Sequence, residues 1–172
     1  GRSAEEVLAA RVSALEGLFP ACPEPAGVAT RPLPALGAVE FTLANGVIAC
    51  CLRQPTPGRV SLQGFALGGS SELDEADECA MGVLDEVSLA AGLGEELGGM
   101  ALSDLQAATQ TRVSIQRHLY HRGIGGSTST GQLGLLLRLV RARLSPAVAA
   151  RLKGCAAGAA GAVARARGRL AA

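Results

Sequence analysis

The sequence predicts an α+β domain in which one antiparallel β-sheet is covered by helices on one face. Three observations lead to this prediction. Segments that alternate apolar and polar residues, as half-buried strands do, come in blocks. The signals between neighbouring strands fit short turns, which join antiparallel neighbours. Segments with apolar residues at helical spacing follow each block, and this order is typical of α+β domains.

The first periodic segment is a helix over residues 3–19, which a proline-rich linker follows. Leu8, Val12 and Leu15 lie at helical spacing, and Ser3 with Glu6 has the pattern of a capping box. Five prolines between positions 20 and 34 exclude a helix or a central strand. We therefore expect an N-terminal helix and extended linker over residues 1–35 and the compact domain over residues 36–172.

Five strands are predicted in this domain, and they cover residues 38–44, 47–53, 59–67, 111–120 and 123–129. The first two strands form a hairpin with a two-residue turn at Asn45-Gly46, which is the strongest local signal in the chain. The third strand follows the turn segment QPTPG and ends in two glycines. A turn joins the last two strands, so they are expected to pair.

Helices are predicted between and after the strands. The acidic segment SSELDEADE begins a helix that runs to about Ala91, because acidic residues suit the positive end of the helix dipole. A short helix begins at Ser103, with Gln106 completing a capping box. Thr130 caps a helix to about Leu144, and Ser145-Pro146 begins another.

The composition argues against two function classes. Aromatic residues make up 2% of the chain, too few for a platform on which single-stranded nucleic acid could stack. No apolar run approaches the roughly 20 residues that a membrane-spanning helix needs. We therefore expect neither a nucleic-acid partner nor a membrane partner.

Charge divides the chain at Asp104. All 15 acidic residues lie at or before this position, whereas most of the 16 basic residues follow it. The two parts are expected to attract each other if they pack in one domain, with Asp74–Glu78 near Arg117, Arg122, Arg138 or Arg141. The helical spacing of the later arginines favours a solvated helix face over a nucleic-acid surface.

The five cysteines, Cys22, Cys50, Cys51, Cys79 and Cys155, are irregularly spaced and odd in number. This pattern favours free thiols in a reducing compartment. Cys50 and Cys51 are adjacent on a predicted strand and face opposite sides, so they are poor joint metal ligands. We expect the cysteines to be small buried residues.

Three further patterns resemble sites, and none is favoured. His118 and His121 lie on a predicted strand, where residues three apart point to opposite faces, so shared metal binding is not expected. The acidic cluster Glu72, Asp74, Glu75, Asp77 and Glu78 lacks the spacing of a calcium loop and is interpreted as a helix start. The segment GGSTSTG at 125–131 lacks the lysine of a phosphate-binding loop. We expect no catalytic, cofactor-binding or metal-ligating residue in this chain.

A family resemblance rests on four segments in order, namely VEFTLANGVIACCL, FALGGSSELDEADECA, GLGEELGGMALSDLQAATQTRVSI and GIGGSTSTGQLGLLLRLVRARLSPAVAARLK. They resemble the insulinase/pitrilysin family of zinc metallopeptidases, and the match covers about residues 36–153. They are most similar to the non-catalytic third domain of its long bacterial and organellar members. The resemblance implies a domain that closes a chamber around a peptide substrate. It also implies that the chain ends before the family domain's last strands.

The resemblance further implies that the family's chemistry lies elsewhere. Its catalytic domain carries an H-x-x-E-H motif and a distal Glu, which hold zinc and activate water. This sequence has no such motif, and no acid follows Asp104. Zinc is therefore expected only in a separate catalytic domain. The implied partners are the catalytic and other domains of the same parent protein or a partner subunit. The alternative is a catalytically inactive structural or interaction module of a larger assembly.

Overall fold

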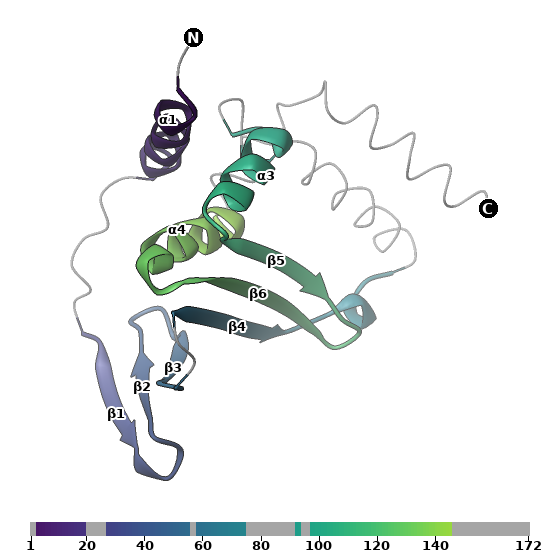
Figure 1. The fold of residues 1–172 in the computed structure, drawn as a ribbon. Helices are drawn as coiled ribbons and strands as arrows, with labels where there is room; N and C mark the ends of the chain where they lie inside the picture. Colours follow the sequence, from purple (N-terminus) through teal and green to yellow (C-terminus); the bar gives the residue numbers. More distant parts are fainter. Residues whose placement is uncertain (1–2, 20–26, 56–57, 75–91, 94–96, 146–172) are drawn as a thin grey trace. The chain divides into compact units, whose positions relative to one another are not determined.

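The computed structural model describes residues 3–19, 27–55, 58–74, 92–93 and 97–145 (Figure 1). The chain divides into two compact units, one formed by Gly1–Leu18 with Gly58–Ala172 and the other by Phe19–Pro57. Both sheets are antiparallel, and helices accompany them, which confirms the predicted α+β class. The strand pairing differs from the single predicted sheet, since the described strands form two three-stranded sheets.

The smaller unit contains the sheet β1-β2-β3, made of Ala29–Leu33, Ala38–Thr42 and Ile48–Leu52. Strand β1 lies where the sequence predicts only an extended linker, so that interpretation is wrong for these five residues. Pro32 is compatible with a strand here because β1 is at the edge of its sheet, where one row of N–H groups faces away from the ladder. A 3-10 turn at Pro34–Leu36 leads from β1 into β2.

Two contacts fix the register of this sheet. Arg31 and Glu40 are directly opposite each other, and two N–H groups of the guanidinium donate to the two carboxylate oxygens at 3.0 and 2.9 Å. The hairpin between β2 and β3 has a three-residue loop, one residue longer than predicted, because Leu43 N–H donates to Val47 O at 2.8 Å. Gly46 closes this loop with φ of +83°, the left-handed conformation that glycine adopts without strain.

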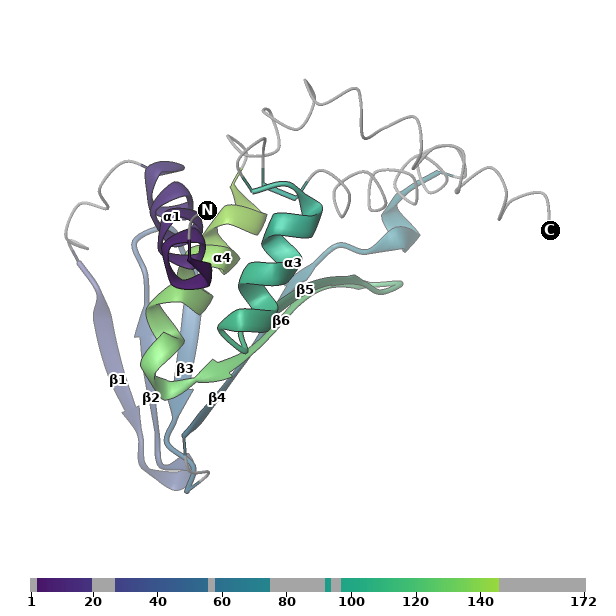
Figure 2. The same ribbon diagram turned by 45° about the horizontal axis from the view of Figure 1, so that its top comes forward.

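The larger unit contains the sheet β4-β6-β5, made of Arg59–Leu67, His121–Ser129 and Arg112–Arg117. Strand β6 is in the middle and pairs along its whole length with β4. Figure 2 shows helices α1 (Ala4–Gly17), α3 (Gly99–Ala108) and α4 (Leu133–Leu144) on one side of this sheet. The predicted arrangement of helices on one face is therefore present.

Leucines form the core between these helices and the sheet. The apolar positions of α4 recur at helical spacing, and the side chains of Leu135, Leu136 and Leu139 are buried. Leu15 of α1 and Leu105 of α3 are also fully buried. The described core is thus built from aliphatic side chains, as the scarcity of aromatic residues predicts.

Helix α1 starts as the sequence predicts. Ser3 accepts a hydrogen bond from Glu6 N–H at 3.2 Å, and the Glu6 carboxylate accepts one from Ser3 N–H at 2.7 Å. This reciprocal capping box satisfies two backbone donors of the first turn.

The other two described helices start differently from the prediction. Helix α3 begins at Gly99, four residues before Ser103, since the burial of Leu102 favours an earlier first turn. Thr130 begins a 3-10 turn, Thr130–Gln132, and its N–H donates to Gly58 O at 3.1 Å. It does not cap α4, which starts at Leu133. The helices predicted up to Ala91 and after Ser145 lie outside the described residues.

One ion pair connects the acidic and basic parts of the chain through α1, since Arg138 of α4 lies 2.9 Å from Glu16. A second pair, in which Arg11 lies 3.1 Å from Asp104 of α3, lies within the acidic part. The described contact between the two parts therefore involves the first helix. Most of Asp74–Glu78, the cluster for which the attraction is predicted, lies outside the described residues.

Candidate functional site

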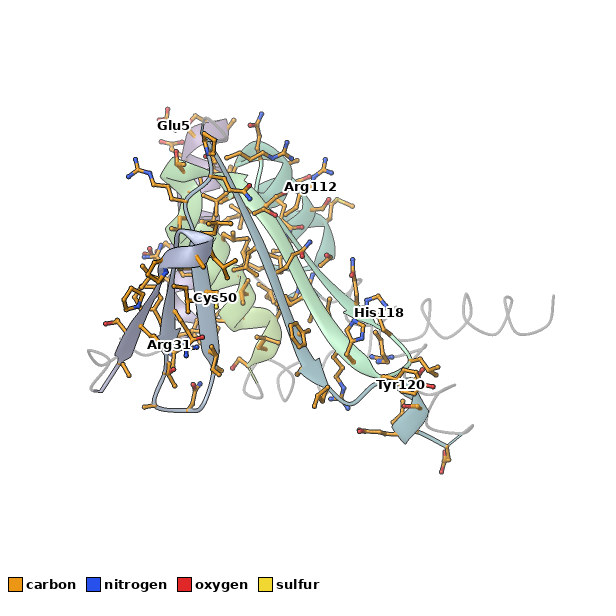
Figure 3. All side chains as sticks on the ribbon, turned by 90° about the horizontal axis from the view of Figure 1, so that it is seen from below. Glu5, Arg31, Cys50, Arg112, His118 and Tyr120 are labelled. Carbon is orange, nitrogen blue, oxygen red and sulfur yellow. The ribbon has the colours of Figure 1, made fainter. Side chains whose placement is uncertain are left out.

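The hairpin between β5 and β6 brings the two histidines of the chain together. His118 and His121 flank a two-residue turn, and their rings stack with centroids 4.2 Å apart and planes inclined by 19°. The prediction that they point to opposite faces is wrong. The strand ends at Arg117, so the two residues lie opposite each other across the turn, and paired residues share a face of the sheet. Figure 3 shows His118 near Tyr120 at this turn, and Arg112 at the other end of β5.

Hydrogen bonds hold the backbone of this turn. His118 N–H donates to His121 O at 2.9 Å, while His118 O accepts from Ser70 N–H at 3.1 Å. Leu119 O accepts from Ser71 N–H at 2.9 Å, and Tyr120 O accepts from Gly68 N–H at 3.2 Å. The end of β4 and the 3-10 turn Ser70–Glu72 thus fix the position of the hairpin.

Strand β5 has an outer edge to which no described strand is hydrogen-bonded. In an antiparallel pair, residues that exchange hydrogen bonds with the partner alternate with residues whose backbone groups point away. Because His118 bonds to its partner His121, the alternation places Gln116 and Ser114 in bonded pairs as well. The backbone N–H and C=O groups of Val113 and Ile115 therefore point outward from the sheet edge. The strand predicted at 111–120 is thus present over Arg112–Arg117, at an edge of its sheet, and these are the groups that it offers for pairing.

The two faces of this sheet differ in what covers them. A Cβ atom added to Gly126 would lie 2.8 Å from Leu136 Cδ1, so this position faces α4. Gly125 and Gly123 face the opposite way, next to Ser114 and Gln116. We call the face turned away from the helices the open face. The middle strand of this face lacks side chains at two positions, because Gly123 and Gly125 of β6 face this way.

Side chains on the open face are polar or exposed apolar groups, and none is acidic. The strands β4, β5 and β6 contain no Asp or Glu, and by alternation Arg59 and Arg112 lie on the open face. Phe65 and Leu67, which are opposite Gly123 and His121, are 81% and 87% exposed. Exposed apolar groups beside hydrogen-bonding groups are typical of surfaces that contact another chain.

Other candidate residues do not assemble into a site. Thr128 of the GGSTSTG segment is buried, and its hydroxyl pairs with that of Thr111, so the hydroxyl is occupied within the fold. Cys50 and Cys51 are free and exposed, which corrects their predicted burial: both lie on β3 at the edge of the small sheet. Cys22, Cys79, Cys155, Glu75, Asp77 and Glu78 lie outside the described residues.

Metal clusters and membrane spans are both absent from the described part of the chain. Its residues contain no group of three or more His, Cys, Asp or Glu side chains that could hold a metal ion. They also contain no helix long and apolar enough to cross a membrane.

Comparison with solved structures identifies the fold. The chain superposes on part of the ferredoxin protease FusC, solved as a mutant in complex with Arabidopsis ferredoxin, with a TM-score of 0.57 and 22% identity over 72% of this chain. It superposes on part of the periplasmic protease PqqL from Escherichia coli with a TM-score of 0.63 and 15% identity over 74% of this chain. The match covers 14% of each protease. The sequence matches no protein-family model and no curated protein. The chain therefore shares its fold with a small part of each protease.

Proposed function

We propose that this chain is a non-catalytic domain of an insulinase-like zinc metalloendopeptidase, where it forms part of the chamber wall and contacts the peptide. The observation that carries the proposal is the fold shared with parts of two proteases. The four sequence segments that resemble the insulinase/pitrilysin family support it, because they occur in the family's order. The match to 14% of each protease is consistent with one domain of a larger enzyme.

The non-catalytic role rests on the residues that this sequence lacks. Zinc peptidases use at least three protein ligands and a general base that activates the metal-bound water. The 172 residues contain two histidines and no H-x-x-E-H motif, and no carboxylate follows them in the sequence. This chain alone therefore cannot supply the ligand set and base of the family, and we place zinc in a separate domain.

The peptide contact rests on the outer edge of β5. A peptide in extended conformation can add to a sheet edge through main-chain hydrogen bonds, which require no special side chains on the domain. Val113 and Ile115 offer the outward N–H and C=O groups for this pairing. Because strands β4, β5 and β6 lack acidic residues, the adjoining surface does not repel acidic segments of a peptide.

The experiment tests peptide binding at the outer edge of β5 by removing one of its outward backbone N–H groups. In Ile115→Pro the outward N–H is removed, while the hydrogen bonds of β5 to β6 are kept because they involve the alternate residues. Ile115→Val is the matched control, since it shortens the side chain and keeps the N–H. We expect the purified wild-type chain and I115V to bind a fluorescein-labelled extended peptide in an anisotropy titration, and I115P to lose at least about tenfold in affinity, as the loss of a well-made hydrogen bond of roughly 1.4 kcal/mol would give.

Three further results decide the rest of the proposal. The chain with added zinc should not cleave a quenched fluorogenic peptide, so cleavage that a chelator abolishes would contradict the non-catalytic role. Equal peptide affinity of I115P and I115V, with both variants folded by circular dichroism, would show that β5 is not the contact. Absence of peptide binding in the wild type would instead favour an inactive structural module.

A further inference from the structure

We propose that His118 and His121 form a surface site for one divalent transition-metal ion, with their imidazoles as the two protein ligands and solvent in the remaining positions. The sequence argument against a shared ion placed the two side chains on opposite faces of a strand. Their stacking at 4.2 Å removes that objection. The site is separate from peptide cleavage and does not depend on the proposed function.

The hairpin positions the two ligands before any ion binds. The two residues face each other across a two-residue turn, and the hydrogen bond from His118 N–H to His121 O closes that turn. The hydrogen bonds from Gly68, Ser70 and Ser71 hold the same turn from the other side. Since little backbone freedom is left to lose, binding costs mainly the rotation of two side chains.

The two rings are near enough to share one ion once a ring turns out of the stack, because the lone pairs of stacked imidazoles do not converge. Two imidazole nitrogens that bind one ion at about 2.0–2.1 Å each lie roughly 3 Å apart. The ring centroids are 4.2 Å apart, so a tilt of one exposed ring brings two nitrogens together. His118 is exposed, and its side chain makes no described hydrogen bond that such a tilt would break.

Gly123 provides room beside the ligands. His118 Nε2 lies 3.7 Å from the place that a Cβ atom of residue 123 would occupy. Because this position on the open face carries no side chain, an ion and its solvent ligands can be accommodated next to Nε2. A larger residue there would narrow this space.

The ligand type selects the ion. Imidazole nitrogen suits Cu²⁺, Ni²⁺ and Zn²⁺, and the general affinity order places Cu²⁺ first. Arg117 and Arg122 form the adjacent cross-strand pair, and their positive charge opposes a cation. They extend toward the helix-covered face, as the alternation of side chains along a strand requires. Because this charge weakens cation binding, we expect that one imidazole is not enough and that both are needed to bind the ion.

The test uses the full chain with its five cysteines alkylated, because free thiols bind and reduce Cu²⁺. Cu²⁺ is titrated in a non-coordinating buffer, with calorimetry for the affinity and electron paramagnetic resonance for the nitrogen ligands. His118→Asn and His121→Asn each remove one ligand. Tyr120→Phe is the control, since it changes the same turn and removes only a phenolic oxygen.

We expect one Cu²⁺ per wild-type chain with two coordinated nitrogens. Each His variant should lose one nitrogen and at least about tenfold in affinity, because even the loss of an outer-shell partner typically costs roughly 10- to 100-fold. The Y120F variant should match the wild type. Wild-type affinity in H118N or in H121N would overturn the proposal, as would absence of Cu²⁺ binding or a single coordinated nitrogen in the wild type. A thermal melt monitored by circular dichroism checks that the variants are folded.

Discussion

The hydroxyl groups of Thr111 and Thr128 lie 2.7 Å apart in the core of the larger unit, and both residues are buried. Thr111 directly precedes β5, and Thr128 is on β6. The Thr111 hydroxyl can also donate to Thr109 O at 3.3 Å, and either hydroxyl can be the donor within the pair. Buried hydroxyl groups are stable only while each has a hydrogen-bond partner. The pair therefore holds the residue before β5 next to the end of β6.

Replacing each threonine by valine should have unequal effects. Thr111→Val leaves the Thr128 hydroxyl without its described partner, which should cost about 1–3 kcal/mol of unfolding free energy. Thr128→Val should cost about 1 kcal/mol, because Thr111 still donates to Thr109 O. The double variant should cost less than the sum. Urea unfolding measures all three, and additive losses would show that the two hydroxyls are not coupled.

Gly126 should tolerate no added methyl group without loss of stability. Its Cβ would lie 2.8 Å from Leu136 Cδ1 and 3.2 Å from Arg112 O, and Leu136 is fully buried. Gly126→Ala should therefore cost about 1–3 kcal/mol in urea unfolding. Gly134→Ala is the matched control in the first turn of α4, where nothing lies within 4 Å, and it should not destabilise the protein. Equal effects of the two changes would show that α4 does not pack on β6 this closely.

Cys50 and Cys51 should react with a thiol reagent in the native protein. Both side chains are exposed on β3, so the reagent reaches them without unfolding. In a reaction with Ellman's reagent, the double variant C50S/C51S should lose the part of the fast phase that these two thiols contribute. A fast phase of unchanged amplitude would mean that both thiols are protected.

The elements that the sequence predicts well are those whose periodicity agrees with their packing. The strand at 59–67 has its predicted bounds, and the capping box of Ser3 and Glu6 marks the start of α1. Strand β1 escapes prediction because two prolines at 32 and 34 outweigh its short extended segment. An edge position accommodates Pro32, but edge position depends on sheet order, which local sequence does not encode.

The candidate site is predictable only in part. Alternation indicates the strand at 111–120, and the structure adds its edge position and which amides point outward. The histidine pair escapes prediction because the expected strand runs three residues too far, to Tyr120 instead of Arg117. The turn at Leu119-Tyr120 has neither glycine nor asparagine, so no usual turn signal marks it. Hydrogen bonds from the distant Ser70 and Ser71 hold this turn, and no local pattern shows them.

The pair between Glu16 and Arg138 should contribute a small, salt-dependent part of the stability of the larger unit. The charged groups lie 2.9 Å apart, but the side chains are 50% and 48% exposed, so water screens the attraction. A double-mutant cycle with Glu16→Gln and Arg138→Gln should give a coupling of about 0.2–1 kcal/mol in low salt. In about 1 M NaCl, where the screening length is roughly 3 Å, the coupling should fall toward zero.

Arg122→Gln on β6 is the matched control for this cycle, since it removes the same charge from the hairpin end of the sheet instead of from α4. Only R138Q should couple to E16Q, because the ion pair joins Glu16 to Arg138. Equal coupling of R122Q and R138Q to E16Q would show that the effect reflects net charge and not this contact. A coupling that persists in high salt would indicate packing of the Arg138 methylenes against α1, since apolar contacts are not screened.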